Sequence, residues 1–140
     1  MQVHIYIELS SNAPAKKRRK YAYLLECITS AGIQTRDGYG ECEDTQHGAA
    51  LRAVLEALNR ITRKCEITIH LSVNWVANGI NTQLPTWFGN RFLKADGKPM
   101  ANQELLKGIV ACWLQFGDLK AEAGPHQYTK WMQDKMRSEP

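Results

Sequence analysis

The sequence lacks a long apolar segment. No run among its 140 residues approaches the roughly 20 apolar residues that a membrane-spanning helix needs. Its start also lacks the charged and apolar regions of a signal peptide, because residues 1–7 (MQVHIYI) already alternate as a strand does. We therefore expect a cytoplasmic protein without membrane contact.

The sequence also lacks the cysteine spacing of a disulfide framework or a zinc site. Its four cysteines are scattered, without a close pair or a histidine at zinc-ligand spacing: Cys27, Cys42, Cys65 and Cys112. Internal repeats, low-complexity segments and interdomain linkers are missing as well. With 44% hydrophobic and 23% charged residues, the composition is ordinary for a globular protein. These features predict free thiols and a single domain over residues 1–140.

The charge is mildly basic. A formal net charge of +4 permits nucleic-acid binding without requiring it. A second basic group closes the first predicted helix and consists of Arg60, Arg63 and Lys64. The first basic group is a run of five cations: Lys16, Lys17, Arg18, Arg19 and Lys20. Such a run is typical either of a solvated loop or of a patch that contacts phosphates.

Apolar periodicity in the first half of the chain predicts a sheet with a helical crossover. Residues 3–9, 21–28 and 32–39 have strand character, which predicts an antiparallel meander ending at Gly38-Tyr39-Gly40. Residues 46–61 place apolar side chains at helical spacing. The isoleucine-rich strand that follows, residues 65–71, is expected to be parallel because a helix connects it to the meander.

The second half of the chain is predicted to be mainly helical. It contains a short helix at 74–78 stopped by Gly79, an aromatic irregular segment at 85–96, a helix at 101–116, a short strand at 118–123 and a last helix at 126–136. The predicted fold class is therefore α/β, with a five-stranded mixed sheet of the α+β kind flanked by helices.

Several ordered segments give these elements a family resemblance. They are residues 49–58 (AALRAVLEAL), 65–71 (CEITIHL) and 76–80 (VANGI), followed by Trp87, Ala95-Asp96, Lys98-Pro99, Asn102 and Leu105. In this order, and with a basic handle loop at the last set, the chain resembles bacterial-type ribonuclease H over about residues 3–136. The resemblance implies a ribonuclease H-like fold and a nucleic-acid partner, since the family cleaves the RNA strand of RNA–DNA hybrids.

The resemblance also locates the family's metal site. Its enzymes hold two magnesium ions with four carboxylates, whose positions fall here on Glu8, His47, Ser72 and Met132. One carboxylate of the four remains, and imidazole, hydroxyl and thioether groups are poor magnesium ligands. We therefore expect no catalytic residues and no bound metal or cofactor, with Glu8 the ligand if any ion binds. Asp134 replaces Met132 only if two residues are inserted nearby.

Two histidines have alternative interpretations. His47, expected near Glu8, either binds one manganese or zinc ion or is an ordinary polar residue early in a helix. Glu122 takes the position of the family's mobile histidine. The nearby His126 is then either a residue at the start of the last helix or a proton shuttle.

The leading hypothesis is a catalytically inactive ribonuclease H-like domain, a pseudoenzyme that binds an RNA–DNA hybrid or another duplex. Trp87 and Phe92 have the alternative role of packing the handle. The expected contacts are the basic run at 16–20 together with Asn74, Trp87, Arg91, Lys94 and Lys98.

Two other functions stay open. An active nuclease that uses magnesium or manganese requires Glu43, Asp44 or Asp134 to converge on Glu8. A protein-interaction scaffold or homo-oligomer requires an apolar, covered surface around His47, Ser72 and Met132.

Overall fold

Alternating side chains of the first strand contact two different hydrophobic clusters in the computed structural model, which describes residues 1–138. Val3, Ile5 and Ile7 belong to the larger cluster, whereas Tyr6, between them, belongs to the smaller one. Because successive side chains of a strand point to opposite faces, the sheet is covered on both sides. The face of the first strand toward the larger cluster is wholly apolar, whereas the opposite face carries His4 and Glu8 beside Tyr6, so the strand alternates in sequence.

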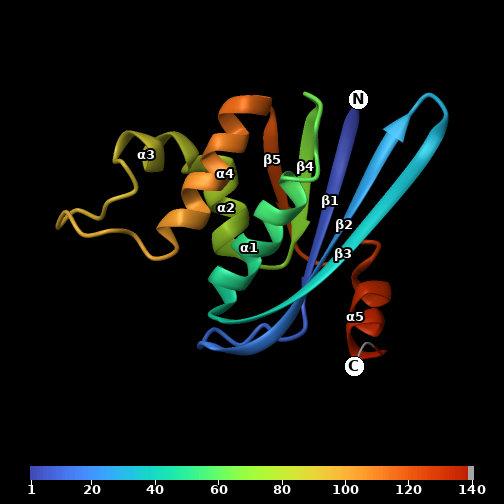
Figure 1. Ribbon diagram of the computed structural model, residues 1–140, viewed down its shortest axis with the longest axis horizontal. Helices are drawn as coiled ribbons and strands as arrows, with labels where there is room; N and C mark the ends of the chain where they lie inside the picture. The colour runs from blue at the N-terminus through green and yellow to red at the C-terminus, as the bar shows by residue number, and fades with distance from the viewer. Residues whose placement is uncertain (139–140) are drawn as a thin grey trace.

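The sheet has five strands in the spatial order β3-β2-β1-β4-β5 (Figure 1). The first three are antiparallel neighbours, and β4 and β5 are added in parallel. This topology confirms the predicted five-stranded mixed sheet. The strands are β1 (Gln2–Leu9), β2 (Lys17–Thr29), β3 (Gly32–Asp44), β4 (Glu66–Leu71) and β5 (Leu119–Ala123).

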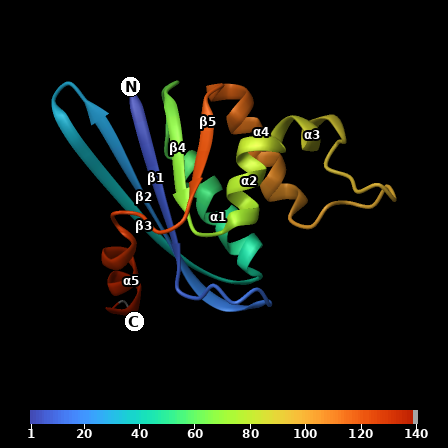
Figure 2. The same cartoon turned by 180° about the vertical axis from the view of Figure 1, so that it is seen from behind.

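The helices divide between the two faces of the sheet. The helices α1, α2 and α4 pack against one face and contribute to the larger cluster. The helix α5 packs against the other face through Met132 and Met136 (Figure 2). The helices are α1 (Gln46–Leu58), α2 (Asn74–Thr82), α3 (Leu84–Gly89), α4 (Gln103–Phe116) and α5 (Thr129–Ser138). Among the described residues, no helix is both long and apolar enough to cross a membrane.

The third strand does not end at Gly38-Tyr39-Gly40, so that prediction is wrong. The antiparallel register places Gly40 opposite Tyr21 and Gly38 opposite Tyr23. A Cβ atom at either glycine would lie 2.2–2.3 Å from the ring of the facing tyrosine. The glycines therefore make room for two aromatic rings inside the strand instead of terminating it.

The predicted stop of the second helix at Gly79 is also wrong, because α2 continues to Thr82. Gly79 lies where Trp87 packs, and a Cβ there would be 2.4 Å from Cη2 of the indole. The glycine is thus a packing residue and not a helix terminator.

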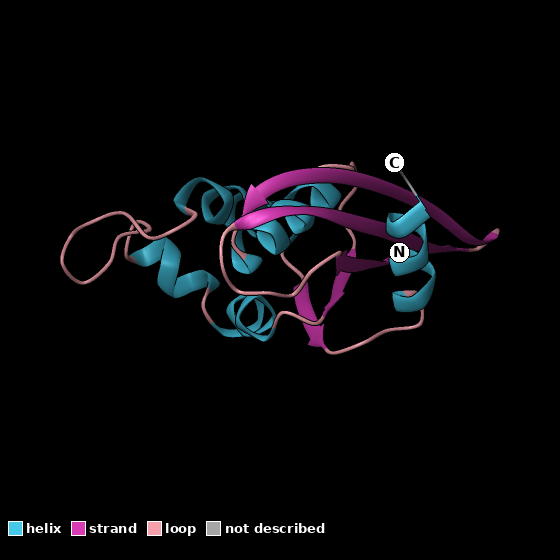
Figure 3. Ribbon diagram, turned by 90° about the horizontal axis from the view of Figure 1, so that it is seen from below, coloured by secondary structure: helices cyan, strands magenta, loops and turns pink. Residues whose placement is uncertain are grey.

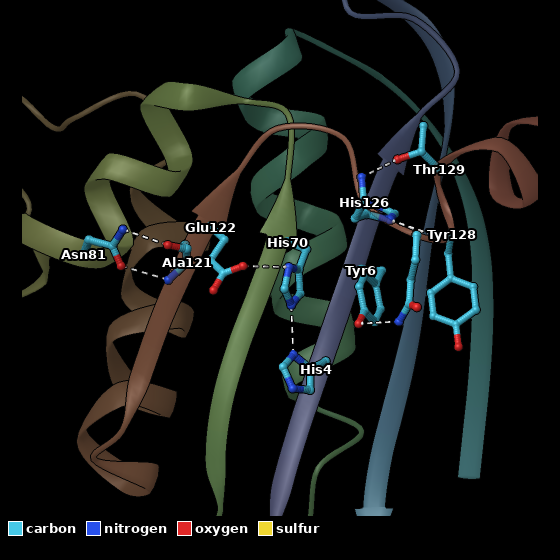
Figure 4. Close-up of polar contacts among 10 residues, drawn as sticks. His4, Tyr6, His70, Asn81, Ala121, Glu122, His126, Tyr128 and Thr129 are labelled. Atoms are coloured by element: carbon cyan, nitrogen blue, oxygen red, sulfur yellow. Dashed lines mark hydrogen bonds and ion pairs between the residues drawn. The ribbon is translucent and has the colours of Figure 1, made fainter. Parts of the chain in front are cut away.

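A side chain of α2 forms hydrogen bonds with the backbone of the edge strand β5. The Asn81 amide donates to the Ala121 carbonyl at 2.9 Å, and its oxygen accepts from the Ala121 backbone amide at 2.8 Å (Figure 4). Both bonds use groups on the side of β5 away from β4, which would otherwise be open to another strand. Asn81 therefore ties α2 to the edge of the sheet.

Candidate functional site

Glu8, at the end of β1, is bound from two sides by the C-terminal helix and the loop before it. Its Oε1 accepts a hydrogen bond from Nε2 of Gln133 at 2.7 Å, and its Oε2 accepts one from the Thr129 hydroxyl at 2.9 Å. Nε2 of His126 lies 2.9 Å from the same Oε2. With Glu8 6% exposed, both carboxylate oxygens are occupied by protein donors.

A backbone hydrogen bond determines the tautomer of the His126 imidazole. Its Nδ1 accepts from the Tyr128 backbone amide at 3.2 Å, so the neutral ring carries its proton on Nε2. That proton lies between Oε2 of Glu8 and the Ile7 carbonyl, 3.2 Å away. The His126 carbonyl also accepts from Thr129 at the start of α5. His126 lies three residues before α5, which begins at Thr129, so the predicted start of the last helix at residue 126 is wrong, and the bond of His126 to Glu8 was not predicted.

Ser72 meets Glu8 at a very small cavity. The cavity has a volume of about 10 Å³ and is lined by residues 7–9 of β1, Asn12 of the following loop, and residues 71–73 at the end of β4. Such a volume is about the least that accommodates one water molecule. The adjacency of these two positions follows from the parallel pairing of β1 with β4.

His47 makes its ring contact with a tryptophan. Its imidazole stacks on Trp75 with ring centroids 4.7 Å apart and planes inclined by 10°, and Trp75 in turn stacks on Trp87 at 5.6 Å. Trp75 is 40% exposed, whereas Trp87 is 6% exposed. The three rings form a column, here called the aromatic column (His47, Trp75, Trp87), which joins the starts of α1 and α2 to α3.

Met132 lies in the core. It is fully buried with Tyr6, Ala22, Leu24 and Met136 in the smaller hydrophobic cluster. A thioether fits this dry environment, whereas burying an unpaired carboxylate there would cost much free energy. The apolar covering expected for a scaffold therefore exists at Met132, but Ser72 is exposed and His47 is half-buried.

The proposed substitute carboxylates point elsewhere. Asp134 is exposed and paired with Lys130 and Arg137 of its own helix, whose hydrogen bonds lower the pKa of its carboxyl. Asp44 accepts from the Thr45 backbone amide at 2.8 Å and faces Arg52 at 3.5 Å. Within residues 1–138, no group of three His, Cys, Asp or Glu side chains is arranged to hold a metal ion. The predicted convergence of Asp134 on Glu8 is wrong, because Gln133 occupies that place.

A second polar group lies beside Glu8 on the same face of the sheet. Nδ1 of His4 and Nε2 of His70 are 2.8 Å apart, and Nδ1 of His70 lies 3.4 Å from Oε2 of Glu122 (Figure 4). Tyr6 stacks on His70 at 4.5 Å. Burial, the largest influence, lowers the pKa of His70, although the Glu122 carboxylate acts in the opposite direction.

The basic run is a strand and not a loop, which corrects the first interpretation of it. Residues 17–20 begin β2, where the register sets Lys17, Arg18 and Lys20 opposite Asp44, Glu43 and Glu41 (a facing acidic stretch of β3). Arg18 pairs with Glu41 at 2.9 Å, and Lys20 donates to the Met136 carbonyl at 3.0 Å. Much of the positive charge is therefore offset by protein groups.

Arg19 of this run is buried and unavailable to a phosphate. Its guanidinium donates to the carbonyls of Ser11, Ala13 and Ala15 at 2.6–2.9 Å, and its side chain is 3% exposed. It therefore organises the turn between β1 and β2. Among the predicted phosphate contacts of the run, Lys16 and Lys17 remain exposed at its start.

The handle (residues 84–102) comprises α3 and an ordered loop that extends away from the sheet (Figure 3). Leu93 bridges Pro99, and the Lys94 backbone amide donates to the Lys98 carbonyl at 2.8 Å, which brings both lysines to its tip. Arg91, Lys94 and Lys98 are exposed. Trp87 and Phe92 are buried, so their alternative role of packing the handle is confirmed.

Comparisons with known proteins agree with this geometry. The chain is 33% identical over 85 residues to the ribonuclease H of Campylobacter curvus, a match that covers 61% of this chain and 55% of the relative. Over this part of its length, the chain is similar in sequence to ribonuclease H. It spans about half the length of the curated relatives it matches. No model of a protein family matches it.

Solved structures show a ribonuclease H-like fold. LC9-RNase H1, a type 1 RNase H with the type 2 active-site motif, superposes with a TM-score of 0.70 and 17% identity over 97% of this chain and 68% of its own. The foamy viral protease-reverse transcriptase, solved with an RNA/DNA hybrid, gives a TM-score of 0.68 at 18% identity over 96% of this chain and 18% of its own.

The donor set at the four family positions does not fit two magnesium ions. Magnesium requires several hard oxygen ligands in near-octahedral geometry. Glu8 offers oxygens that Thr129, Gln133 and His126 already bind, and the other three positions offer a stacked imidazole, a hydroxyl and a buried thioether. No reaction step through such ions can be derived from these residues.

Residues of the site that the sequence pattern did not identify include Trp75, Gln133 and Thr129. Trp75 is the exposed ring of the aromatic column, and its neighbour Asn74 had been singled out on polarity alone. Gln133 binds Glu8 from a position next to the expected Asp134. Helical periodicity places Gln133 and Thr129 on one face four residues apart, which is the signal that could have identified them.

Proposed function

We propose that the chain is a ribonuclease H-like domain that binds RNA–DNA hybrid without cleaving it. The observation that carries the proposal is the use of Glu8. Its carboxylate holds the C-terminal helix through Gln133 and Thr129, so it serves the fold and not a metal. The domain then keeps the nucleic-acid-binding shape of the fold while lacking the ligands for two-metal hydrolysis.

The binding surface in this proposal combines the aromatic column with the handle. Trp75 is 40% exposed, and because His47 and Trp87 stack on its two sides, the exposed part is the edge of the indole, which a base or sugar can contact. Asn74, beside it, adds an exposed amide at the start of α2. The handle adds three cations, Arg91, Lys94 and Lys98, and none of them is paired with a carboxylate among the described residues.

A relative's partner supports the choice of ligand. The foamy viral enzyme that shares the fold was solved with an RNA/DNA hybrid. Guanidinium and ammonium groups contact phosphates without regard to sequence, so we expect affinity to fall as salt concentration rises. The four free thiols agree with a reducing compartment, and we propose that the domain acts in the cytoplasm.

The test uses an end-labelled RNA–DNA hybrid incubated with magnesium and, separately, with manganese. Strand cleavage and gel retention are scored on the same samples. We expect retention without cleavage in both metals, and a weaker complex when Arg91, Lys94 and Lys98 are all replaced by Gln. The matched control replaces three cations that are paired with carboxylates, Lys107, Lys130 and Arg137, by Gln and should retain hybrid as the parent does.

Two results would overturn the proposal. Cleavage that disappears in Glu8→Gln would show that the carboxylate serves catalysis. Absence of retention at low salt would remove nucleic-acid binding and favour a protein-interaction scaffold.

A further inference from the structure

A cavity of about 360 Å³ lies at the end of the sheet opposite Glu8. The start of β1, the hairpin between β2 and β3, and the segment that follows α1 surround it. The helix α1 has 13 residues and therefore separates the two ends by about 20 Å. His47 stands at the first end of this helix and the cavity at the second, so the cavity is distinct from the proposed hybrid surface.

Three arginines from two segments converge on this cavity, here called the arginine pocket. Arg36 comes from β3, where the register sets it opposite the core residue Leu25, and Arg60 and Arg63 follow α1. The lining contains no carboxylate, and none of the three forms an ion pair with the described residues. The pocket therefore holds three positive charges without a protein counter-charge.

The position of Arg60 is fixed by a tyrosine. Its Nη1 donates to the Tyr23 hydroxyl at 3.1 Å, and its guanidinium carbon lies 6.0 Å from the centre of the Tyr23 ring. Tyr23 is buried in the core next to Gly38, which makes room for the ring. One guanidinium of the pocket is thus held in place before any ligand arrives, which reduces the entropy lost on binding.

The rest of the lining is divided between apolar and polar groups. Val3, Leu25 and Ile61 supply an apolar wall, and Gln34 and Thr62 supply amide and hydroxyl groups. A lining of this kind, with a few polar groups and a volume above about 300 Å³, is typical of a small-molecule site. A purely ionic ligand would leave the apolar wall unused.

We propose that the arginine pocket binds a nucleoside phosphate, either free or as the phosphorylated end of a nucleic-acid strand. Arginine forks bind phosphate oxygens in pairs, and three of them match a group with two or three negative charges better than a single carboxylate. The apolar wall receives the flat face of the base, and Gln34 and Thr62 reach the sugar or the base edge. The ligand is recognised by contacts alone, without a chemical step.

Binding is measured by isothermal titration of the whole chain with adenosine monophosphate, adenosine and inorganic phosphate. Backbone amide shifts of the labelled protein locate the site. We expect the monophosphate to bind at least tenfold more tightly than adenosine or phosphate, with shifts at Arg36, Ile61 and Thr62. Equal affinity for phosphate and the monophosphate would overturn the proposal, as would shifts confined to other residues.

Charge-removing variants provide the second arm. Arg36→Ala and Arg63→Ala each remove one positive charge from the pocket and should weaken binding of the monophosphate at least tenfold. Both variants should still fold, because both side chains are exposed and neither contributes to the core. Arg137→Ala removes the same charge from α5 and should change affinity less than twofold. Unchanged affinity in both pocket variants would contradict the proposal, and circular dichroism confirms that each variant is folded.

The two sources of the ligand are separated with short strands that carry a 5′-phosphate or a 5′-hydroxyl. Preference for the phosphorylated strand, lost in Arg36→Ala, identifies a strand end as the ligand. Binding of the free monophosphate with no preference between strands identifies a mononucleotide. Neither result depends on hybrid binding by the handle, so this proposal fails or stands separately.

Discussion

Glu8 and His126 face each other inside the protein, with Oε2 and Nε2 2.9 Å apart and side chains 6% and 3% exposed. The contact joins the central strand to the loop before α5. Thr129 and Gln133 add two bonds to the same carboxylate, so one side chain of β1 fixes the entry and first turns of the last helix. A carboxylate at this position therefore serves the fold, whatever the site can still bind.

Replacing Glu8 by Gln tests this structural role. The amide nitrogen would face the Nε2 donor of Gln133 or the donors of His126 and Thr129, leaving one buried donor unpaired. We expect the free energy of unfolding to fall by about 1.5–3 kcal/mol, measured by urea denaturation. The control Glu66→Gln, on the exposed side of β4, should change it by less than about 0.5 kcal/mol. Equal losses in both variants would contradict the role.

The lowered pKa of His70 predicts a pH dependence of stability. Burial lowers it most, His4 and His126 lower it further, and Glu122 and Glu26 act in the opposite direction. An unfolded histidine titrates near pH 6.5, so the unfolded chain binds more protons than the folded one below that pH. This contribution is therefore present above about pH 6.5 and is lost as the pH falls toward the folded pKa.

Urea denaturation at pH 7.5, 6.5 and 5.5 measures this slope. We expect the parent protein to lose stability across the series and His70→Asn to lose less, because asparagine does not titrate. A slope that His70→Asn leaves unchanged would assign the pH dependence to other groups.

The sheet and the order of its strands and helices could be predicted, because the spacing of apolar residues along the sequence distinguishes strands from helices. What failed was the meaning of glycine. Gly38, Gly40 and Gly79 have the local signature of breakers, yet each makes room for an aromatic ring from a neighbouring strand or helix. A single sequence does not distinguish the two roles, since the ring that fills the space is set by tertiary packing.

The site was predicted less well, for a related reason. The alternation of β2 can be followed backward from Tyr23 and Tyr21 to Arg19, which places its side chain toward the core. Charge alone favoured a solvated loop instead. Helical periodicity places Gln133 and Thr129 on one face of α5, but no local signal shows that this face meets Glu8, which lies near the opposite end of the chain.

Gly79→Ala tests the packing role of this glycine. Alanine normally favours a helix interior over glycine by about 1 kcal/mol. Here the added Cβ would meet the buried indole of Trp87 at 2.4 Å, so we expect a net destabilisation of about 1–3 kcal/mol. Gly89→Ala at the end of α3 has no atom within 4 Å of its new Cβ and should not lower the melting temperature. A stabilising Gly79→Ala would contradict the close contact.

The buried Arg19 and the exposed Arg18 allow a structural arginine to be compared with a surface arginine. Arg19→Lys keeps the charge but loses the planar fork that bonds three carbonyls, and we expect a loss of about 1–3 kcal/mol. Arg18→Lys alters an exposed pair with Glu41 and should cost less than about 0.5 kcal/mol. Thermal unfolding of both variants decides the point, because similar melting temperatures would mean that Arg19 is not a structural residue.

Two exposed tryptophans distinguish a nucleic-acid surface from general hydrophobic exposure. Trp75 and Trp131 are 40% and 47% exposed, but Trp75 stacks between His47 and Trp87 near the handle, whereas Trp131 lies on α5. Trp75→Ala removes the exposed indole edge and the middle ring of the column, so it should weaken hybrid retention about fivefold or more, the lower end of the range for contacts between bases and aromatic rings. Trp131→Ala should leave retention within twofold, measured by gel shift at fixed salt. If both variants lose affinity equally, exposure and not the aromatic column accounts for binding; if only Trp131→Ala loses it, the hybrid lies on the α5 face and the proposed surface is wrong.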